Sequence, residues 1–340
     1  KKDSTPYKVY TPYYRRGCLS LPSPRRPLSA PKNIQISEKS KHSLTLEELY
    51  LKPIIKWDEK ITNRWTVSEK AAQQRLDEFV LDELQDYRDG RNFPDKANVS
   101  RLSPYLHFGQ ISPNTAWYRA LDASALIANE KSLDTFLSEL GWREFSYYLL
   151  YHFPHLPHKN LQSKFDAFPW PKTQASILRL WKSGKTGYPL VDAGMRELYS
   201  TGYMHNRVRM VVGSFLVKNL LIHWHEGESW FWDCLVDADL ASNSAGWQWI
   251  AGCGADAAPY FRIFNPITQS EKFDKQGNYI RRYVPELANM PDKFIHAPWL
   301  APEHILKEAG IEIDVNYPAP VVDIKMSRAL ALEAFAQTKT

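Results

Sequence analysis

Residues 237–249 read Asp-Ala-Asp-Leu-Ala-Ser-Asn-Ser-Ala-Gly-Trp-Gln-Trp, and they form the most informative stretch of the chain. Asp239, Asn243 and Gly246 are spaced i, i+4 and i+7, so a helix places them on one side. Asparagine is a poor helix former, and glycine inside a helix costs about 1 kcal/mol relative to alanine. The stretch therefore predicts a helix with a flat ligand lying on this face. The alternative is that the acids only cap the helix N-terminus, where the macrodipole favours them.

A second polar face is predicted at Glu139, Trp142 and Arg143, spaced i, i+3 and i+4. A carboxylate, an indole and a guanidinium together can contact a planar heteroaromatic ligand. The alternative is an exposed Glu–Arg pair beside a core tryptophan, which is common and contributes only about 0.3–0.5 kcal/mol. Taken alone, this window favours the alternative.

A third face combines Asn206, Arg209 and Met210 at the start of an apolar helix. An arginine drawn toward such a core needs an anionic partner. The alternative is that the arginines at the start of this helix contact only solvent.

Upstream, residues 98–104 combine serine hydroxyls, an arginine and successive backbone N–H groups, which suit a phosphate site. A loop of this composition is also compatible with having no ligand.

The rest of the chain predicts helices and almost no strands. Helical periodicity covers roughly 174–183, 189–200, 204–225, 228–236, 238–251, 302–309 and 327–337. Helix starts are expected at Thr66, Ser112 and Ser132. Strand-like alternation is limited to 261–264 and 279–284. The expected fold class is all-α, a multi-helix bundle without a parallel sheet.

Two parts of unequal size are expected. Residues 1–36 contain six prolines and little periodicity, which indicates a linker or wrapping segment. Residues 37–340 are expected to form the helical domain. Because the chain starts at Lys1 without a methionine, an excised or processed product is expected.

Composition narrows the function classes. The three cysteines, Cys18, Cys234 and Cys253, form no CxxC pair, so neither a disulfide framework nor a metal site is expected, and a reducing compartment fits. No apolar run approaches the roughly 18 residues that cross a bilayer, and no signal peptide opens the chain, so no membrane partner is expected. The net charge of +5 suits a polyanionic partner without requiring one.

Taken together, these stretches resemble the cryptochrome/photolyase family, and within it the FAD-binding catalytic domain of class I cyclobutane pyrimidine dimer (CPD) photolyases. The resemblance runs from about Pro6 to near residue 320. The motifs that carry it are residues 100–103, 139–145, 184–189, 204–210, 237–249 and 260–266.

The resemblance implies that the domain holds a U-shaped FAD, active as the reduced anion FADH−. It implies that Arg209 pairs with Asp237 beside the isoalloxazine, that Asp239 contacts the pyrimidine edge of the ring, and that Asn243 faces N5. Photolyases usually carry an asparagine there, whereas many cryptochromes carry aspartate or cysteine. The residues expected to bind FAD are Tyr87, Val99, Ser100, Arg101, Leu102, Ser103, Phe136, Arg143, Asn206, Arg209, Asp237, Asp239, Asn243 and Gly246.

The resemblance further implies light-driven repair, in which excited reduced flavin passes an electron to a dimer flipped out of UV-damaged DNA. Glu139 would hydrogen-bond the dimer carbonyl in a protonated form favoured by apolar surroundings. The residues expected to contact the substrate are Glu139, Trp142, Asn206, Met210, Trp249, Arg207 and Arg262. His205 falls between these positions and is expected to be structural.

Trp247, Trp224 and Trp170 match the family's electron-hopping chain, by which electrons reach the flavin from the surface. The alternative is three core tryptophans. With Glu139 and Asn243, these three complete the expected catalytic set. Family members begin with an α/β domain that helps house an antenna pigment. No such domain precedes Lys1, so the antenna cannot be inferred.

Three alternative functions are compatible with parts of this sequence. A (6-4) photolyase is disfavoured, because such enzymes carry histidines where this chain has Asn206 and Met210. A signalling cryptochrome without repair is disfavoured by Asn243 and by the chain ending soon after 327–337. The third is a helical nucleic-acid binder whose motifs are only core packing. A monomer is expected, in the cytoplasm with DNA, with a nuclear or organellar location left open.

Overall fold

The computed structural model describes residues 5–35, 42–124, 129–257 and 261–338. Over these residues the chain is helical and has no strand beyond one isolated bridge between Ile313 and Tyr317, so the all-α prediction is confirmed. The helices are α1 (Tyr10–Pro12), α2 (Glu59–Thr62), α3 (Glu69–Glu78), α4 (Tyr87–Gly90), α5 (Ser103–His107), α6 (Pro113–Asp122), α7 (Glu130–His152), α8 (Ala175–Lys182), α9 (Pro189–Thr201), α10 (Asn206–Ser214), α11 (Trp224–Cys234), α12 (Leu240–Ala251), α13 (Pro266–Phe273), α14 (Asn278–Tyr283), α15 (Glu303–Ala309) and α16 (Ile324–Gln337).

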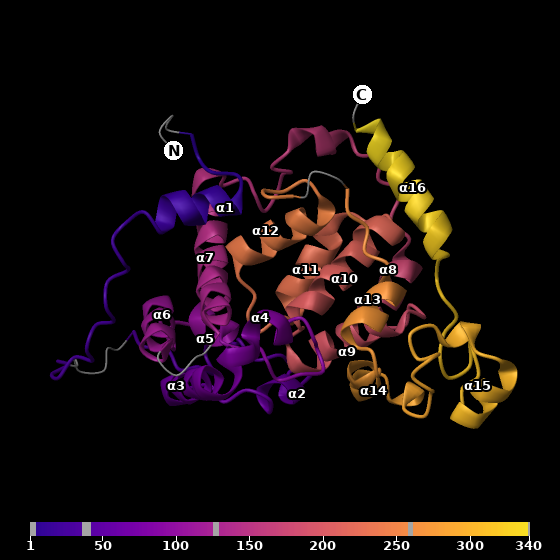
Figure 1. The fold of residues 1–340 in the computed structure, drawn as a ribbon, viewed down its shortest axis with the longest axis horizontal. Coiled ribbons are helices and arrows are strands. Elements are labelled where there is room, and N and C mark those ends of the chain that lie inside the picture. Colours follow the sequence, from indigo (N-terminus) through magenta and orange to yellow (C-terminus); the bar gives the residue numbers. More distant parts are fainter. Residues whose placement is uncertain (1–4, 36–41, 125–128, 258–260, 339–340) are drawn as a thin grey trace.

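Helix α12 occupies the junction of the molecule. It packs against α7, α10 and α11, as Figure 1 shows. One apolar core lies among α3 to α7, and a larger one lies among α8 to α16. The stretch quoted at the outset therefore lies where the two cores meet.

Side-chain caps fix several helix starts. Asp239 caps α12, because its carboxylate accepts the Ser242 N–H at 2.8 Å, and Ser112 caps α6 in the same way. Two predicted starts were wrong. Ser68 caps α3 instead of Thr66, and Asn129 caps α7, so that Ser132 lies inside the helix. The prediction of strand-like structure at 279–284 was also wrong, since most of that window belongs to α14.

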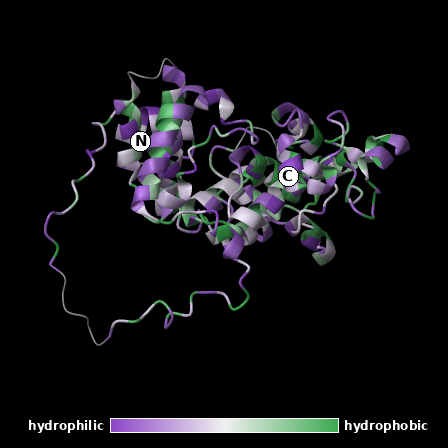
Figure 2. Ribbon diagram, turned by 90° about the horizontal axis from the view of Figure 1, so that it is seen from below, coloured by the Kyte–Doolittle hydropathy of each residue, from purple (hydrophilic) through white to green (hydrophobic). Residues whose placement is uncertain are grey.

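Part of the N-terminal segment is helical. Helix α1 continues into a π-helical turn at Tyr13–Cys18, and the buried Tyr10 and Tyr14 pack on α7. A Cβ on Gly141 of α7 would lie 2.6 Å from the Tyr14 ring, so only glycine admits this contact. The chain on either side of residues 36–41 extends away from the helices (Figure 2). The predicted boundary at 36/37 and residue 260 of one motif lie outside the described residues, and the two-part division stays a prediction.

Two absences hold for the part of the chain that the structure describes. No helix there has both the length and the apolar content needed to cross a membrane. No group of three or more histidine, cysteine, aspartate or glutamate side chains there is placed to hold a metal ion.

Glycines position the buried tryptophan of α12. A Cβ on Gly227 of α11 would lie 2.1 Å from the Trp247 ring, whereas a Cβ on Gly246 would meet nothing within 4 Å. Both glycines lie inside helices, so each lowers helix stability by a similar free energy relative to alanine. Only Gly227 is required by packing.

We predict that Gly227→Ala destabilises the protein by about 1–3 kcal/mol, because Trp247 must shift in a packed core. Gly246→Ala is the matched control and should raise stability by up to about 1 kcal/mol through helix propensity alone. Urea unfolding of the ligand-free proteins measures both. Equal effects of the two substitutions would contradict the packing argument.

Candidate functional site

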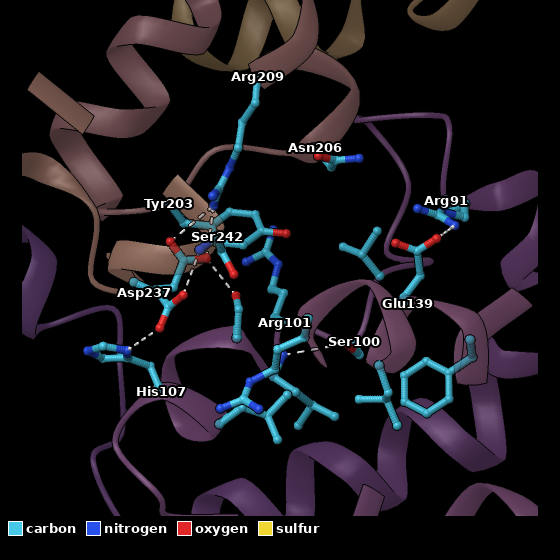
Figure 3. A pocket seen from close by; sticks show the side chains of 18 of the residues that line it. Arg91, Ser100, Arg101, His107, Glu139, Tyr203, Asn206, Arg209, Asp237 and Ser242 are labelled. Carbon is cyan, nitrogen blue, oxygen red and sulfur yellow. Dashed lines mark hydrogen bonds and ion pairs between the residues drawn. The ribbon is translucent and has the colours of Figure 1, made fainter. Parts of the chain in front are cut away.

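A cavity of about 300 Å³ lies between the 99–103 loop and the start of α12; we call it the serine-loop cavity (Figure 3). Its walls come from both halves of the molecule. The residues lining it are Tyr87, Arg91, Val99, Ser100, Arg101, Leu102, Ser103, Leu106, His107, Phe136, Glu139, Leu140, Arg143, Tyr203, Asn206, Arg209, Asp237, Asp239 and Ser242.

The 99–103 loop has a specific backbone shape. Arg101 has a positive φ of 53°, and Leu102 follows in the right-handed region. This alternation turns successive N–H groups toward one side, an arrangement that suits anions. Arg75 of α3 holds the loop, because its Nε donates to the Ser100 carbonyl at 2.9 Å. Sequence reasoning missed Arg75, because no local pattern links it to a loop that lies 25 residues further along the chain.

Arg209 and Asp237 form the ion pair that the resemblance implied. Arg209 Nη2 lies 2.9 Å from Asp237 Oδ2, and the Asp237 side chain is only 4% exposed. Ser103 donates a hydrogen bond to the same carboxylate at 2.6 Å. Burial alone would lower the pKa of Arg209, but the charge of Asp237 raises it overall. The pair therefore joins α10, α5 and the approach to α12.

A second, larger cavity of about 630 Å³ adjoins the first; we call it the tryptophan cavity. The two share Arg91, Glu139, Asn206, Arg209 and Ser242. The other residues lining it are Trp142, Phe145, Ser146, Leu149, Met210, Phe231, Asn243, Ala245, Gly246, Trp247, Trp249, Ile250, Ala255, Asp256 and Arg262. Among the described residues, no atom outside the neighbouring part of α12 lies within 4 Å of a Cβ on Gly246, so the predicted ligand-facing side of α12 opens into this cavity.

The surroundings of Glu139 differ from the apolar ones expected. Its Oε1 lies 2.5 Å from Arg91 Nη1, and the two side chains are 33% and 20% exposed. Arg91 comes from the end of α4, some 48 residues away along the chain. Sequence reasoning missed it, because no local pattern links these two positions.

Asn243 is held from the side opposite the cavity. Its Nδ2 donates to the backbone carbonyl of Glu228 at 3.0 Å. The Glu228 carboxyl accepts from Ser244 Oγ at 2.5 Å, and burial raises its pKa to about 7. Glu228 was also missed. Asp239 accepts from Tyr147 and Ser242; burial would raise its pKa, but these hydrogen bonds lower it overall.

Some predicted residues lie elsewhere. The Arg207 guanidinium donates a hydrogen bond to the Asn92 side chain and lies over the Phe273 ring. Arg207 is not among the described residues that line either cavity. Trp224 is buried and Trp170 is half-buried, and both lie away from the cavities. His205 is buried as expected of a structural residue: its Nδ1 accepts the Arg207 N–H, and burial lowers its pKa to about 3.

The site has the features of a pocket for a large, anionic, partly planar cofactor. The serine-loop cavity offers hydroxyls, Arg101 and a turned backbone to phosphates. The open face of α12 at Gly246, beside the Arg209–Asp237 pair, offers a flat surface to a ring system. Both volumes lie in the usual range for ligand pockets. The residues present therefore fit FAD.

Comparisons with known proteins agree with this class of site. Residues 136–337 match the family model described as the FAD binding domain of DNA photolyase. The chain is 48% identical to a deoxyribodipyrimidine photo-lyase of Agrobacterium fabrum, over 99% of this chain and 70% of that protein. It is 37% identical to cryptochrome-1 of Arabidopsis thaliana, over 98% and 50% of the two chains.

A crystal structure of a class III photolyase from Agrobacterium tumefaciens superposes with a TM-score of 0.94, at 47% identity over 99% of this chain and 70% of that one. The chain belongs to the cryptochrome/photolyase family, and its helical part is the FAD-binding domain of a DNA photolyase. The finer prediction of class I is not confirmed, since this structural relative is of class III.

We predict that Asp237→Ala destabilises the ligand-free protein by about 2 kcal/mol or more, because Arg209 is left partly buried without an anion. The double variant Asp237→Ala with Arg209→Met should be less destabilised than the sum of the two single variants. Urea unfolding of all four proteins gives the coupling. Simple additivity would show that the pair contributes nothing.

Lys218 hydrogen-bonds the backbone of Arg262, which lines the tryptophan cavity. Its burial indicates that the stability of the protein depends on pH. Its Nζ donates to the carbonyl of Arg262, and burial lowers its pKa from 10.5 to about 7. Between these values the unfolded state binds the extra proton, so stability rises with pH. We predict that Lys218→Met reduces the rise in unfolding free energy from pH 7 to pH 9 by about 2 kcal/mol. Parallel pH profiles for both proteins would contradict this.

Proposed function

We propose that this protein uses blue light and reduced FAD to split cyclobutane pyrimidine dimers in DNA. The observation that carries the proposal is the pair of adjoining cavities with shared walls. One is suited to an anionic cofactor, and the other is wide, faced by tryptophans and lined by an exposed arginine, Arg262. A photoreaction between two bound molecules requires them to be held in contact, and shared walls meet this requirement.

We propose that the serine-loop cavity binds the phosphate and ribose end of FAD through Ser100, Arg101, Ser103 and Tyr87. The Arg209–Asp237 pair, Asp239 and Asn243 are proposed to hold and orient the ring. The further proposed contacts are Val99, Leu102, Phe136, Arg143, Asn206 and Gly246. Bound in its reduced form, FAD supplies an electron that blue light raises to an energy sufficient to reduce a pyrimidine dimer.

The proposed substrate site is the tryptophan cavity. Trp142 of α7 and Trp249 of α12 supply aromatic faces on which flipped bases can stack. Asn206 and Met210 complete the wall, and the exposed Arg262 and Arg207 are proposed phosphate contacts. A dimer stacks and pairs poorly in the duplex, so extruding it costs less than extruding a normal base.

Glu139 is proposed to stabilise charge on the dimer carbonyl. A carboxyl group donates a hydrogen bond only when it is protonated. Arg91 has five N–H donors, so it can pair with Glu139 and still donate to a ligand. The Glu139–Arg91 pair as a unit is therefore the proposed polar contact of the lesion.

Three residue choices support dimer repair over the alternatives. By resemblance, (6-4) enzymes carry histidines at the positions of Asn206 and Met210, and many cryptochromes carry aspartate or cysteine at that of Asn243. The photo-lyase of Agrobacterium fabrum, which is named for a dipyrimidine substrate, matches at 48% identity, whereas the plant cryptochromes match at 37%, 40% and 42%. We propose a monomer that acts on UV-damaged DNA in the cytoplasm.

Trp170, Trp224 and Trp247 are proposed to carry electrons inward from the surface. The His223 ring lies 4.9 Å from that of Trp170 and 5.6 Å from that of Trp224, so it bridges the outer pair. Trp247 lines the tryptophan cavity and packs on Phe231 with ring centroids 4.9 Å apart.

The decisive experiment is illumination of the purified, reduced protein with oligothymidine that contains cyclobutane dimers. Recovery of thymine absorbance in the light and none in the dark is expected. The same assay on a (6-4) substrate should show no repair. Flavin-loaded protein that repairs neither lesion would overturn the proposal in favour of a signalling role.

We predict that Glu139→Ala lowers the repair rate about 10- to 100-fold while flavin content is unchanged, because one charged hydrogen-bonding partner is lost. Glu139→Gln keeps a donor and should retain more activity. The control is Glu144→Ala on the same helix, whose side chain is exposed and pairs with Arg143. Repair by Glu139→Ala at the rate of Glu144→Ala would remove Glu139 from the site.

A further inference from the structure

Of the three tryptophans that line the tryptophan cavity, Trp142 and Trp249 are held by the N-terminal segment. Tyr10 of α1 stacks on Trp142 with ring centroids 3.8 Å apart and an interplanar angle of 12°. The Tyr10 hydroxyl donates to the backbone carbonyl of Ser138 at 2.5 Å. The Tyr10 ring, 6% exposed, thus lies against Trp142 and is fixed at its far end by a bond to α7.

The same segment reaches the opposite wall. The Asp256 N–H donates to the carbonyl of Lys8, two residues before Tyr10, at 2.9 Å. The carbonyl of Asp256 in turn accepts from Trp249 Nε1 at 3.1 Å. Two residues of one short segment are therefore connected to Trp142 on α7 and to Trp249 on α12.

Further packing makes this segment stiff. Tyr14 stacks on the other side of Tyr10 at 5.4 Å, and both rings approach Gly141 closely enough that any Cβ there would collide with them. Phe145 meets Tyr10 edge-on at 5.8 Å. Tyr10 therefore cannot move without disturbing the face of α7 that carries Trp142.

We propose that residues 8–14 act as a clamp that sets the gap between Trp142 and Trp249, with Tyr10 as the positioning residue for the flipped lesion. This inference rests on the proposed function, in that it takes the tryptophan cavity as the lesion site. Tyr10 does not line the cavity. It acts through Trp142, so its effect falls on lesion affinity and not on the photochemical step.

Ordinary core packing would give a different pattern. Removal of a core ring lowers stability wherever the ring lies, whereas loss of the clamp specifically loosens Trp142. Tyr7 is the matched control: it belongs to the same aromatic cluster, packs on Tyr13 and Tyr148, and is partly buried. Tyr7→Ala removes an equal ring from the same segment and leaves the Tyr10–Trp142 stack intact.

The experiment compares Tyr10→Ala, Tyr10→Phe and Tyr7→Ala in the full flavin-loaded chain. Tyr10→Ala should raise Kd and KM for dimer-containing oligothymidine roughly three- to tenfold, with kcat at saturation unchanged. Tyr10→Phe keeps the stacking ring and should stay within about twofold of the wild type. If Tyr10→Ala does not fold, Tyr10→Leu fills the space without a stacking ring and replaces it.

A second readout needs no DNA. In protein labelled with 5-fluorotryptophan, the fluorine resonance of Trp142, assigned through Trp142→Phe, should shift in Tyr10→Ala and not in Tyr7→Ala. An unchanged resonance, or a Kd no weaker than that of Tyr7→Ala, overturns the clamp. If the Trp142 resonance shifts in Tyr10→Ala but the wild-type protein does not prefer dimer-containing DNA, the clamp is supported and the proposed substrate is overturned.

Discussion

The Arg209–Asp237 ion pair is the interaction on which the arrangement of the site depends. Asp237 immediately precedes α12, Arg209 lies in α10, and Ser103 at the start of α5 bonds the same carboxylate. Three elements that are distant in sequence therefore meet at one buried charge. An unpaired carboxylate that is 4% exposed would be strongly destabilising, so these elements cannot separate without a large penalty. The open face of α12 lines the tryptophan cavity and the serine loop lines the serine-loop cavity, and Arg209 lines both.

Close packing of aromatic rings then determines where the larger cavity lies. Trp247 can reach its position only because Gly227 presents no Cβ to it, and Tyr14 and Tyr10 approach α7 only because residue 141 is glycine. Rings seated in this way have few alternative rotamers, so the walls they form are rigid. Gly246 has the opposite role, because the space above it belongs to the cavity. Gly141 and Gly227 thus allow close packing against aromatic rings, whereas Gly246 leaves space over α12 for a ligand.

The sequence predicted what local periodicity encodes. The spacing of Asp239, Asn243 and Gly246 predicted that they share one helical face, and the cap that Asp239 forms is the alternative that the sequence had left open beside a ligand contact. The partner of Arg209 was inferred from family resemblance, since spacing alone required an anion without identifying it. Arg75, Arg91 and Glu228 were missed because each acts on residues far away in the chain or through backbone atoms. The error at Thr66 was local: Ser68, two residues later, has the extended backbone that a capping residue needs.

The Glu139–Arg91 pair shows why a residue shared by two cavities is hard to interpret from its own helix. Within α7, the i+3 neighbour of Glu139 is Trp142, so the helix alone predicts a carboxyl group beside an indole. In the fold, a guanidinium from the end of α4 lies against it, and both groups line both cavities. A carbonyl ligand entering between them meets a donor that is already oriented by its counter-charge, so little reorganisation is needed when charge develops on that carbonyl. Because the same pair also borders the serine-loop cavity, a change in the charge of one ligand acts electrostatically on the other through it. With the proposed ligands bound, the Glu139–Arg91 pair would couple the two cavities by charge in addition to the residues that they share.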